Sequence, residues 1–197
     1  MQEETSASEL QGRLALIESM IAEGRRSTES WGWAFVFWGL AYYVAMAWSR
    51  WGNQTLAWPV TMTVASLLMI ALGRRRKRAR QAPTTAGRAI ASVWIAVGIS
   101  MFALLLALGL SHLLEERIFM SIVAAMMGTA NAASAMILRW KPQFACTLVW
   151  WATCVVCAAG SDAQSTDALI VAVFLCQIVF GIYVLLRKTG ERKAAHA

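Results

Sequence analysis

IFMSIVAAMMGTANAASAMIL, residues 118–138, is an apolar run without a single Asp, Glu, Lys, Arg or His. A helix of about 20 residues spans the roughly 30 Å of hydrocarbon in a bilayer. Five further runs of this kind cover residues 31–48, 55–73, 89–111, 143–160 and 168–186. The sequence therefore predicts an all-α integral membrane protein built as a bundle of six transmembrane helices.

The composition supports this class and excludes others. Of the 197 residues 58% are hydrophobic and 15% are charged, which lies outside the usual range for a soluble domain. Membrane strands are not expected, because the runs are too long and lack apolar/polar alternation. Proton relays, ion-coupled pumps and voltage sensors normally need charged groups inside the membrane, so the uncharged runs argue against these functions.

The Lys and Arg residues lie almost entirely on one side of the predicted helices. Sixteen of the 18 fall in residues 1–30, 74–88, 139–141 and 187–193. Only Arg50 and Arg117 fall in connections on the other side. Short basic loops stay in the cytoplasm. We therefore expect three hairpins in a bacterial cytoplasmic (inner) membrane, with both chain ends in the cytoplasm.

This orientation divides the chain into three parts. Residues 1–28 are expected to form a short cytoplasmic amphipathic helix, residues 29–188 the transmembrane domain, and residues 189–197 a basic cytoplasmic tail. The first part is the only one with the pattern of a water-facing interaction element.

The N-terminal segment has the pattern of a helix that binds a partner. Its apolar residues follow at spacings of four, three and four, which places them on one helical face: Leu10, Leu14, Ile17 and Ile21. A helix of two heptads is not stable alone, so we expect a partner to cover this face. Residues 1–30 carry a net charge of −3, which opposes binding to an anionic membrane surface. Docking on the chain's own basic loop is a further alternative.

That basic loop follows the second predicted helix. Five consecutive positions carry the charge, namely Arg74, Arg75, Arg76, Lys77 and Arg78. We expect them to contact anionic lipid headgroups. Nucleic-acid binding is not expected, because the loop has no interleaved aromatics and no folded reader accompanies it.

Small residues recur at four-residue spacing in the fourth predicted helix, at Ala124, Gly128 and Ala132. Such a seam lets two helices approach closely. We expect it to pack within the chain, with a homo-oligomer as the alternative. Asn131 and Gln177 could form hydrogen bonds between helices, a role that requires no ligand.

Two groups of residues suggest chemistry only weakly. Cys154 and Cys157 form a CxxC pair in the fifth predicted helix and are candidates for thiol redox chemistry, although buried thiols usually behave as inert apolar groups. His112, Glu115 and Glu116 lie together near one helix end. We interpret these three as an ordinary charged turn, so no metal site is predicted.

Residues 32–43, GWAFVFWGLAYY, resemble the GWxFxxxWxxLY stretch of the tryptophan-rich sensory proteins, the bacterial relatives of the translocator protein. The resemblance covers about one helix, the family's other motifs are not found, and its five helices differ from the six expected here. No family is assigned from it.

The sequence thus favours a non-enzymatic membrane anchor, an adapter or regulatory subunit that acts through its N-terminal helix and needs no cofactor. The second hypothesis is a small permease, or a binder of lipids or other apolar molecules, with an aromatic cavity. Membrane thiol redox chemistry at Cys154 and Cys157 is the third.

Overall fold

A computed structural model describes residues 9, 11–19, 22, 32–77, 85–110 and 115–194. All secondary structure in this part of the chain is helical. After a helical segment at residues 11–19, the elements are α2 (Gly32–Trp51), α3 (Gln54–Lys77), α4 (Thr85–Leu110), α5 (Glu116–Leu138), α6 (Lys141–Ala159), α7 (Asp162–Val173), η1 (Phe174–Val179) and α8 (Phe180–Ala194).

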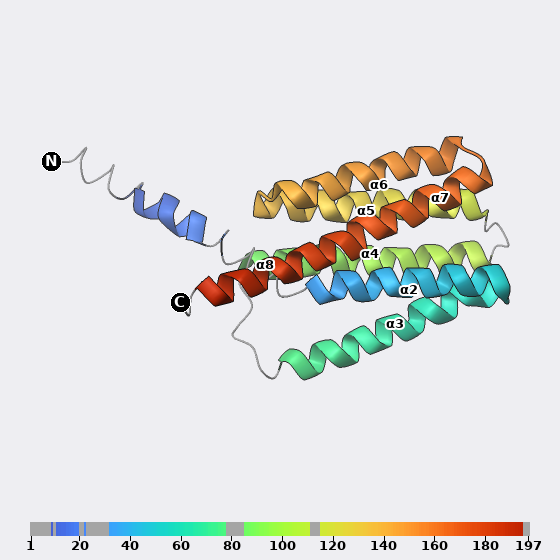
Figure 1. Ribbon diagram of the computed structural model, residues 1–197, viewed down its shortest axis with the longest axis horizontal. Coiled ribbons are helices and arrows are strands. Elements are labelled where there is room, and N and C mark those ends of the chain that lie inside the picture. The colour runs from blue at the N-terminus through green and yellow to red at the C-terminus, as the bar shows by residue number, and fades with distance from the viewer. Residues whose placement is uncertain are drawn as a thin grey trace.

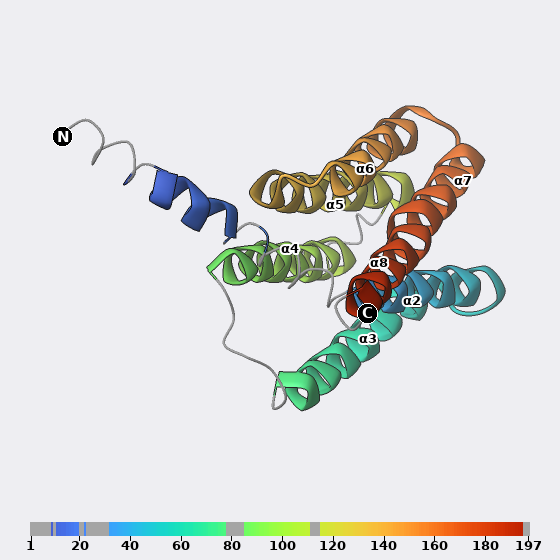
Figure 2. The ribbon, with the colours of Figure 1, turned by 60° about the vertical axis from the view of Figure 1, so that its left-hand side comes forward.

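The long helices run alternately in opposite directions (Figure 1). α5 and α6 make the most extensive contact, and the continuous α7–η1–α8 rod packs against α6 and α2. α3 packs on α2, whereas α4 packs mainly on α5. Figure 2 shows that α3 and α4 stand apart at the ends that precede and follow residues 78–84. The bundle therefore has a packed side and a looser side.

Two short turns hold α5, α6 and α7 next to one another. Arg139 ends α5 in the left-handed conformation, with φ 48° and ψ 48°. At the next turn, the Ser161 hydroxyl accepts a hydrogen bond from the Gln164 amide, and the Gln164 side-chain oxygen accepts one from the Ser161 amide. This reciprocal capping box starts α7. Each turn is two residues long, so the helices it joins must lie antiparallel and adjacent.

The last predicted helix differs from expectation in three ways. It begins at Asp162 rather than at residue 168, because the capping box starts it within the predicted loop. A π-helical segment, η1, interrupts its middle. Its end reaches Ala194, so part of the predicted tail at residues 189–197 is helical.

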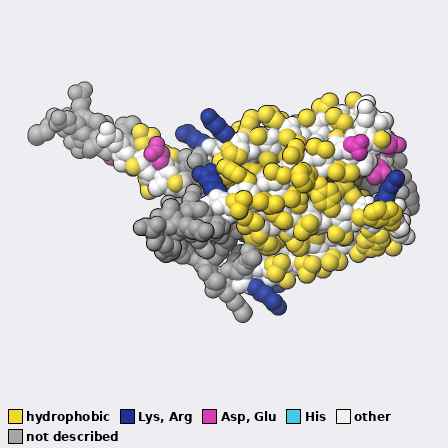
Figure 3. Space-filling model, viewed as in Figure 1, with side chains coloured by type: hydrophobic (Ala, Val, Ile, Leu, Met, Phe, Trp, Pro, Cys, Tyr) yellow, Lys and Arg dark blue, Asp and Glu magenta, His cyan; other side chains and the backbone are white. Residues whose placement is uncertain are grey.

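Among the described residues, five helices are long and apolar enough to cross a membrane: Leu56–Arg75, Thr85–Leu108, Glu116–Leu138, Lys141–Ala159 and Asp162–Arg187. On the face drawn in Figure 3, hydrophobic side chains cover the middle of the bundle, and charged side chains lie toward its two ends. An apolar belt between charged ends is typical of a membrane protein.

The interior of the bundle is built largely around α5. Its buried residues are mostly small, and 56% of its apolar stretch is buried. Aromatic side chains of α2, α4, α8 and the α5–α6 turn add to this core. Phe35 packs edge-on against Trp94 and Phe180, with ring centroids 5.9 Å and 5.2 Å apart, and Trp140 lies 5.4 Å from Phe180. The Trp94 indole also donates a hydrogen bond of 3.1 Å to the Ser134 hydroxyl of α5.

Candidate functional site

The apolar face predicted on the N-terminal segment is uncovered where the structure describes it. Leu14 and Ile17 are 55% and 51% exposed, on a helix whose outer surface carries an ion pair of 2.7 Å between Arg13 and Glu9. Leu10 and Ile21 lie outside the described residues. Leu14 and Ile17, the two described residues of this face, therefore lie three positions apart on one helical segment, and both expose apolar surface.

The predicted lipid-contacting residues lie at the C-terminal end of α3. The Arg74 and Arg75 side chains are exposed there. Arg76 and Lys77 belong to the same helix, but the placement of their side chains lies outside the described part, as does all of Arg78. Arg88 in the first turn of α4, Arg139 and Lys141 at the α5–α6 turn, and Arg187 within α8 belong to segments at the same end of the bundle (Figure 1). Basic residues thus gather at one end of the bundle.

The small-residue seam of α5 faces the interior. Ala124 and Ala132 are 0% and 3% exposed, and Gly128 is also buried. A Cβ atom added at Gly128 would collide with the Trp151 indole of α6. Nearby, the Ser121 hydroxyl donates a 3.0 Å hydrogen bond to the Cys154 carbonyl. Within this chain, α6 covers the seam.

A second close approach, between α2 and the last rod, was not predicted from the sequence. A Cβ added at Gly32 would lie 2.9 Å from Val184, one at Gly39 would lie 2.7 Å from Ile178, and one at Gly181 would lie 2.7 Å from Val36. Three glycines thus allow α2 to lie directly on η1 and α8. The signal in the sequence was the seven-residue spacing of Gly32 and Gly39 inside an aromatic-rich helix.

The two cysteines of the CxxC pair point to different neighbours. Cys154 Sγ lies 3.3 Å from the Ser121 hydroxyl of α5, whereas Cys157 Sγ lies 3.7 Å from the Ser165 carbonyl of α7. The structure instead brings together Cys146 of α6 and Cys176 of η1, where the Cys176 thiol lies 3.6 Å from the Cys146 carbonyl. Both of these residues are buried, and all four thiols are free.

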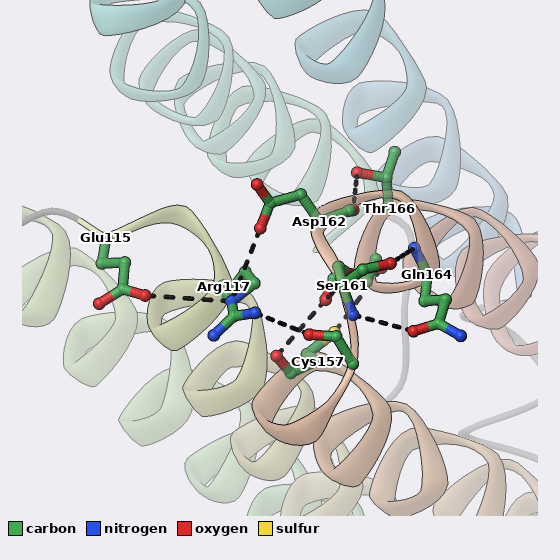
Figure 4. Close-up of polar contacts among 9 residues, drawn as sticks. Glu115, Arg117, Cys157, Ser161, Asp162, Gln164 and Thr166 are labelled. Atoms are coloured by element: carbon green, nitrogen blue, oxygen red, sulfur yellow. Dashed lines mark hydrogen bonds and ion pairs between the residues drawn. The ribbon is translucent and has the colours of Figure 1, made fainter.

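At the opposite end of the bundle from the basic residues, Arg117 joins α5 to the α6–α7 turn. Its guanidinium donates a 2.7 Å hydrogen bond to the Gly160 carbonyl and lies 3.6 Å from the Asp162 carboxylate and 3.9 Å from Glu115. Figure 4 shows Arg117 between the two acidic side chains. We call this group of contacts the Arg117 clasp. Its charges are partly to almost fully exposed, from 37% for Arg117 to 93% for Asp162, so they do not form a buried site.

Two hollows lie beside this clasp. One, of about 210 Å³, is lined by Glu115, Glu116, Arg117, Met120, Asp162, Ser165 and Thr166. The other, of about 450 Å³, is a shallow depression lined by Val155, Val156, Ala159, Gly160, Gln164 and Asp167. Within the described residues no group of three or more His, Cys, Asp and Glu could hold a metal ion, and His112 lies outside them.

The interhelical hydrogen bonds that Asn131 and Gln177 could form are not found among the described residues. The Asn131 amide donates to the Met127 carbonyl of its own helix at 2.9 Å. Among the described residues, Asn131 Oδ1 and Gln177 Oε1 are buried without a hydrogen-bond partner, and so are both side-chain polar atoms of Gln143 and the Trp150 indole nitrogen. An α-helical backbone offers its side chains carbonyls four residues back, and Asn131 takes that local partner.

Comparison of the chain with protein-family models, with curated proteins and with solved structures gives no match. Function is therefore inferred from the side chains themselves.

Proposed function

We propose that this chain is a non-enzymatic adapter of a bacterial cytoplasmic membrane, which anchors a protein partner through its N-terminal helix. In this proposal it crosses the membrane six times with both ends in the cytoplasm. The observation that carries the proposal is the apolar surface of Leu14 and Ile17, each more than half exposed on a segment outside the bundle.

The sixth crossing in this proposal is α2. It holds 20 residues, of which the 18 before Arg50 carry no charge. It packs along η1 and α8, which belong to a helix long enough to span. Gly32 and Gly39 of α2 and Gly181 of α8 let the two helices pack closely. In this proposal α2 therefore lies at the same depth in the membrane as the α7–η1–α8 rod.

Charge supports the orientation. Arg74, Arg75, Arg88, Arg139, Lys141 and Arg187 lie at one end of the bundle, and only Arg50 and Arg117 among the described basic residues lie at the other. Basic residues beside short loops remain in the cytoplasm. At that surface, Arg74 and Arg75 are placed to contact anionic lipid headgroups.

The partner in this proposal is a protein rather than the lipid surface. The N-terminal helix carries apolar residues on one face, which is typical of a helix that binds a hydrophobic groove or a second amphipathic helix. The net charge of −3 over residues 1–30 opposes a position on an anionic leaflet.

Deletion of residues 1–27 tests the adapter role, with recovery of bound proteins from mild detergent as the measurement. A sharper version replaces Leu14 and Ile17 by Asp. Its matched control replaces Gln11 and Ser19 by Asp, which adds the same two charges to other exposed faces of the helix. The proposal expects a partner that is lost from the deletion and from the first variant but kept by the control. If the deletion, the first variant and the control all recover the same bound proteins, the adapter role is contradicted.

A second candidate is a small permease or a binder of lipids or other apolar molecules. The observation in its favour is the set of buried polar atoms around Gln143 and Gln177. Against it, neither of the two hollows beside the Arg117 clasp is lined by Asn131 or Gln177.

The thiol redox hypothesis has less support. Cys154 and Cys157 contact different helices rather than a common partner. Retained function in a variant with Ser at both positions would remove it.

A further inference from the structure

The N-terminal helix carries charged residues at defined positions beside its apolar face. In residues 11–19 every side chain of this helix is exposed. Leu14 and Ile17, which are 55% and 51% exposed, lie three positions apart and therefore on one face. With Leu10 and Ile21 the spacings along the sequence are four, three and four. This is the pattern of a coiled coil, with Leu14 at an a position and Ile17 at a d position of the heptad.

The same heptad register fixes the g and e positions that flank the apolar face. Arg13 directly precedes Leu14 and occupies a g position, and Glu18 directly follows Ile17 and occupies an e position. In a parallel coiled coil, a g residue of one helix faces the e residue of the other helix five positions further on. Two copies of this helix paired in parallel therefore set Arg13 of each copy opposite Glu18 of the other. The remaining flanking position of residues 11–19 is Gln11, which is uncharged.

The charge of Arg13 is accessible for such a pair. Its guanidinium forms an ion pair of 2.7 Å with Glu9 of the same helix, and the two side chains are 75% and 65% exposed. A guanidinium has several N–H donors and can bind more than one carboxylate. The pair with Glu9 is therefore compatible with a second pair across two helices.

The membrane supplies what the short apolar face lacks. A helix of two heptads is not stable alone. Copies of one chain insert in one membrane with the same orientation, so their N-terminal helices lie on one side at a high effective concentration. Residues 23–31 connect this helix to α2, and a chain of that length reaches up to about 30 Å. Two such helices can thus meet without contact between the bundles.

From these observations we infer that the N-terminal helix pairs in parallel with the same helix of a second copy of this chain. Leu14 and Ile17 form the buried face of the pair, and Arg13 and Glu18 form ion pairs between the copies. The inference rests on the proposed function, because it names the protein that the helix binds. A groove on another protein needs only the apolar face, whereas opposite charges at matching g and e positions favour a copy of the same helix.

Disulfide cross-linking in isolated membranes tests the pairing in the full chain. Leu14→Cys places a thiol on the apolar face, where parallel helices bring equal positions together. The matched control Ser19→Cys places it at the f position, on the outer side of the same helix. Copper phenanthroline serves as the oxidant, and non-reducing electrophoresis measures the dimer. The inference expects a dimer from Leu14→Cys and only the background of the unaltered chain from Ser19→Cys. Equal amounts from the two variants overturn it.

Reversal of the charges tests the register. Arg13→Glu and Glu18→Arg are introduced separately into the chain with Leu14→Cys. Either change leaves only like charges between two identical copies, so we expect each chain to form about fivefold less dimer with itself. Co-expression of the two differently tagged chains restores opposite charges in both pairs, and the mixed dimer should return to the original amount. The mixture contains the same two helices, so a change in helix stability cannot explain this recovery. Mixed and self dimers in equal amounts overturn the inference.

The two experiments separate this inference from the adapter role. Suppose that Leu14→Cys gives no more dimer than Ser19→Cys, but replacing Leu14 and Ile17 by Asp still removes a different co-purifying protein. The adapter role then stands, and the second copy is overturned as the partner. If changes on the apolar face alter neither the dimer nor the co-purifying proteins, both proposals are overturned.

Discussion

α4 and α5 are consecutive helices of similar length, yet they occupy different environments. Only 6% of the apolar stretch of α4 is buried, against 56% of that of α5, although α4 is the more apolar of the two. In water the more apolar helix would be the buried one. Lipid tails solvate Leu and Ile as well as a protein core does, so small and polar residues decide which helix packs inside.

α3 resembles α4, with 11% of its apolar stretch buried. The two peripheral helices each pack mainly on one neighbour, whereas α5, α6 and the α7–η1–α8 rod pack on one another. The rod is the most apolar span and is still 44% buried; its inner face carries Ser165, Ala172, Gln177 and Gly181 beside the larger Leu169, Val173, Phe180 and Val184. Hydropathy alone therefore does not separate the packed side from the periphery.

The largest difference is expected for the loss of a leucine. Leu138 of α5 is 0% exposed and Leu106 of α4 is 64% exposed. Leu138→Ala leaves a cavity and is expected to lower the free energy of unfolding by about 2–5 kcal/mol. Leu106→Ala removes only lipid contact and is expected to change it by less than about 0.5 kcal/mol. Unfolding in mixed micelles measures both, and equal losses would contradict the division into packed and peripheral helices.

Two glycines give a second matched pair. Gly128→Ala forces Trp151 away from α5, for an expected loss of about 1–3 kcal/mol. A Cβ at Gly98 of α4 would meet nothing within 4 Å. Gly98→Ala is therefore expected to stabilise the helix by about 0.5–1 kcal/mol. The same unfolding assay should report opposite signs, and a loss at Gly98 would mean that α4 has a neighbour at that face.

The Arg117 clasp is expected to make a smaller contribution at the end of the packed side. Arg117→Met removes the hydrogen bond to the Gly160 carbonyl and the nearby ion pairs. Because its side chain is 37% exposed, we expect a loss of about 1 kcal/mol. Arg50→Met, at the same end of the bundle, serves as the control. Similar losses in both variants would show that total charge, not the clasp, is responsible.

The smallest effect is expected at the α5–α6 turn. Arg139 holds a left-handed conformation, which costs a non-glycine residue roughly 1 kcal/mol. Arg139→Gly removes this cost but adds chain entropy to the unfolded state, for a net gain of about 0.5 kcal/mol. Arg75→Gly, inside the exposed part of α3, should instead destabilise by about 0.5–1 kcal/mol. Destabilisation by Arg139→Gly would point to a structural role for its side chain.

Much of the helical architecture followed from the sequence, because uncharged runs long enough to cross a bilayer have few alternative structures. The α5 seam was also recognisable from the sequence, because Ala124, Gly128 and Ala132 follow at four-residue spacing within one helix. Contacts between elements that are distant in the sequence could not be predicted in this way. The Gly32–Val184 and Cys146–Cys176 contacts join residues far apart in the chain, whereas the local CxxC spacing suggested a pair that the structure divides between α5 and α7.

The π-helix was also missed. Its residues FLCQIV have the pattern of an ordinary apolar helix, and nothing in their composition marks a π-helical turn. The burial of individual tryptophans could not be predicted either. Trp150 is fully buried and Trp151 is 42% exposed, although they are adjacent in the sequence. Adjacent residues of a helix point about 100° apart, so which of the two is buried depends on where the neighbouring helices lie.

The most direct test of the account is whether α2 crosses the membrane. One added cysteine, at Gln11 or at Ala163, reports on the N-terminal segment or on the α6–α7 turn; both positions are exposed. Sealed cells are treated with a membrane-impermeant maleimide before and after permeabilisation, with the unaltered chain as the background. Six crossings predict labelling of Ala163→Cys in sealed cells, and of Gln11→Cys only after permeabilisation. Labelling of both in sealed cells would mean that α2 does not cross and would contradict the account.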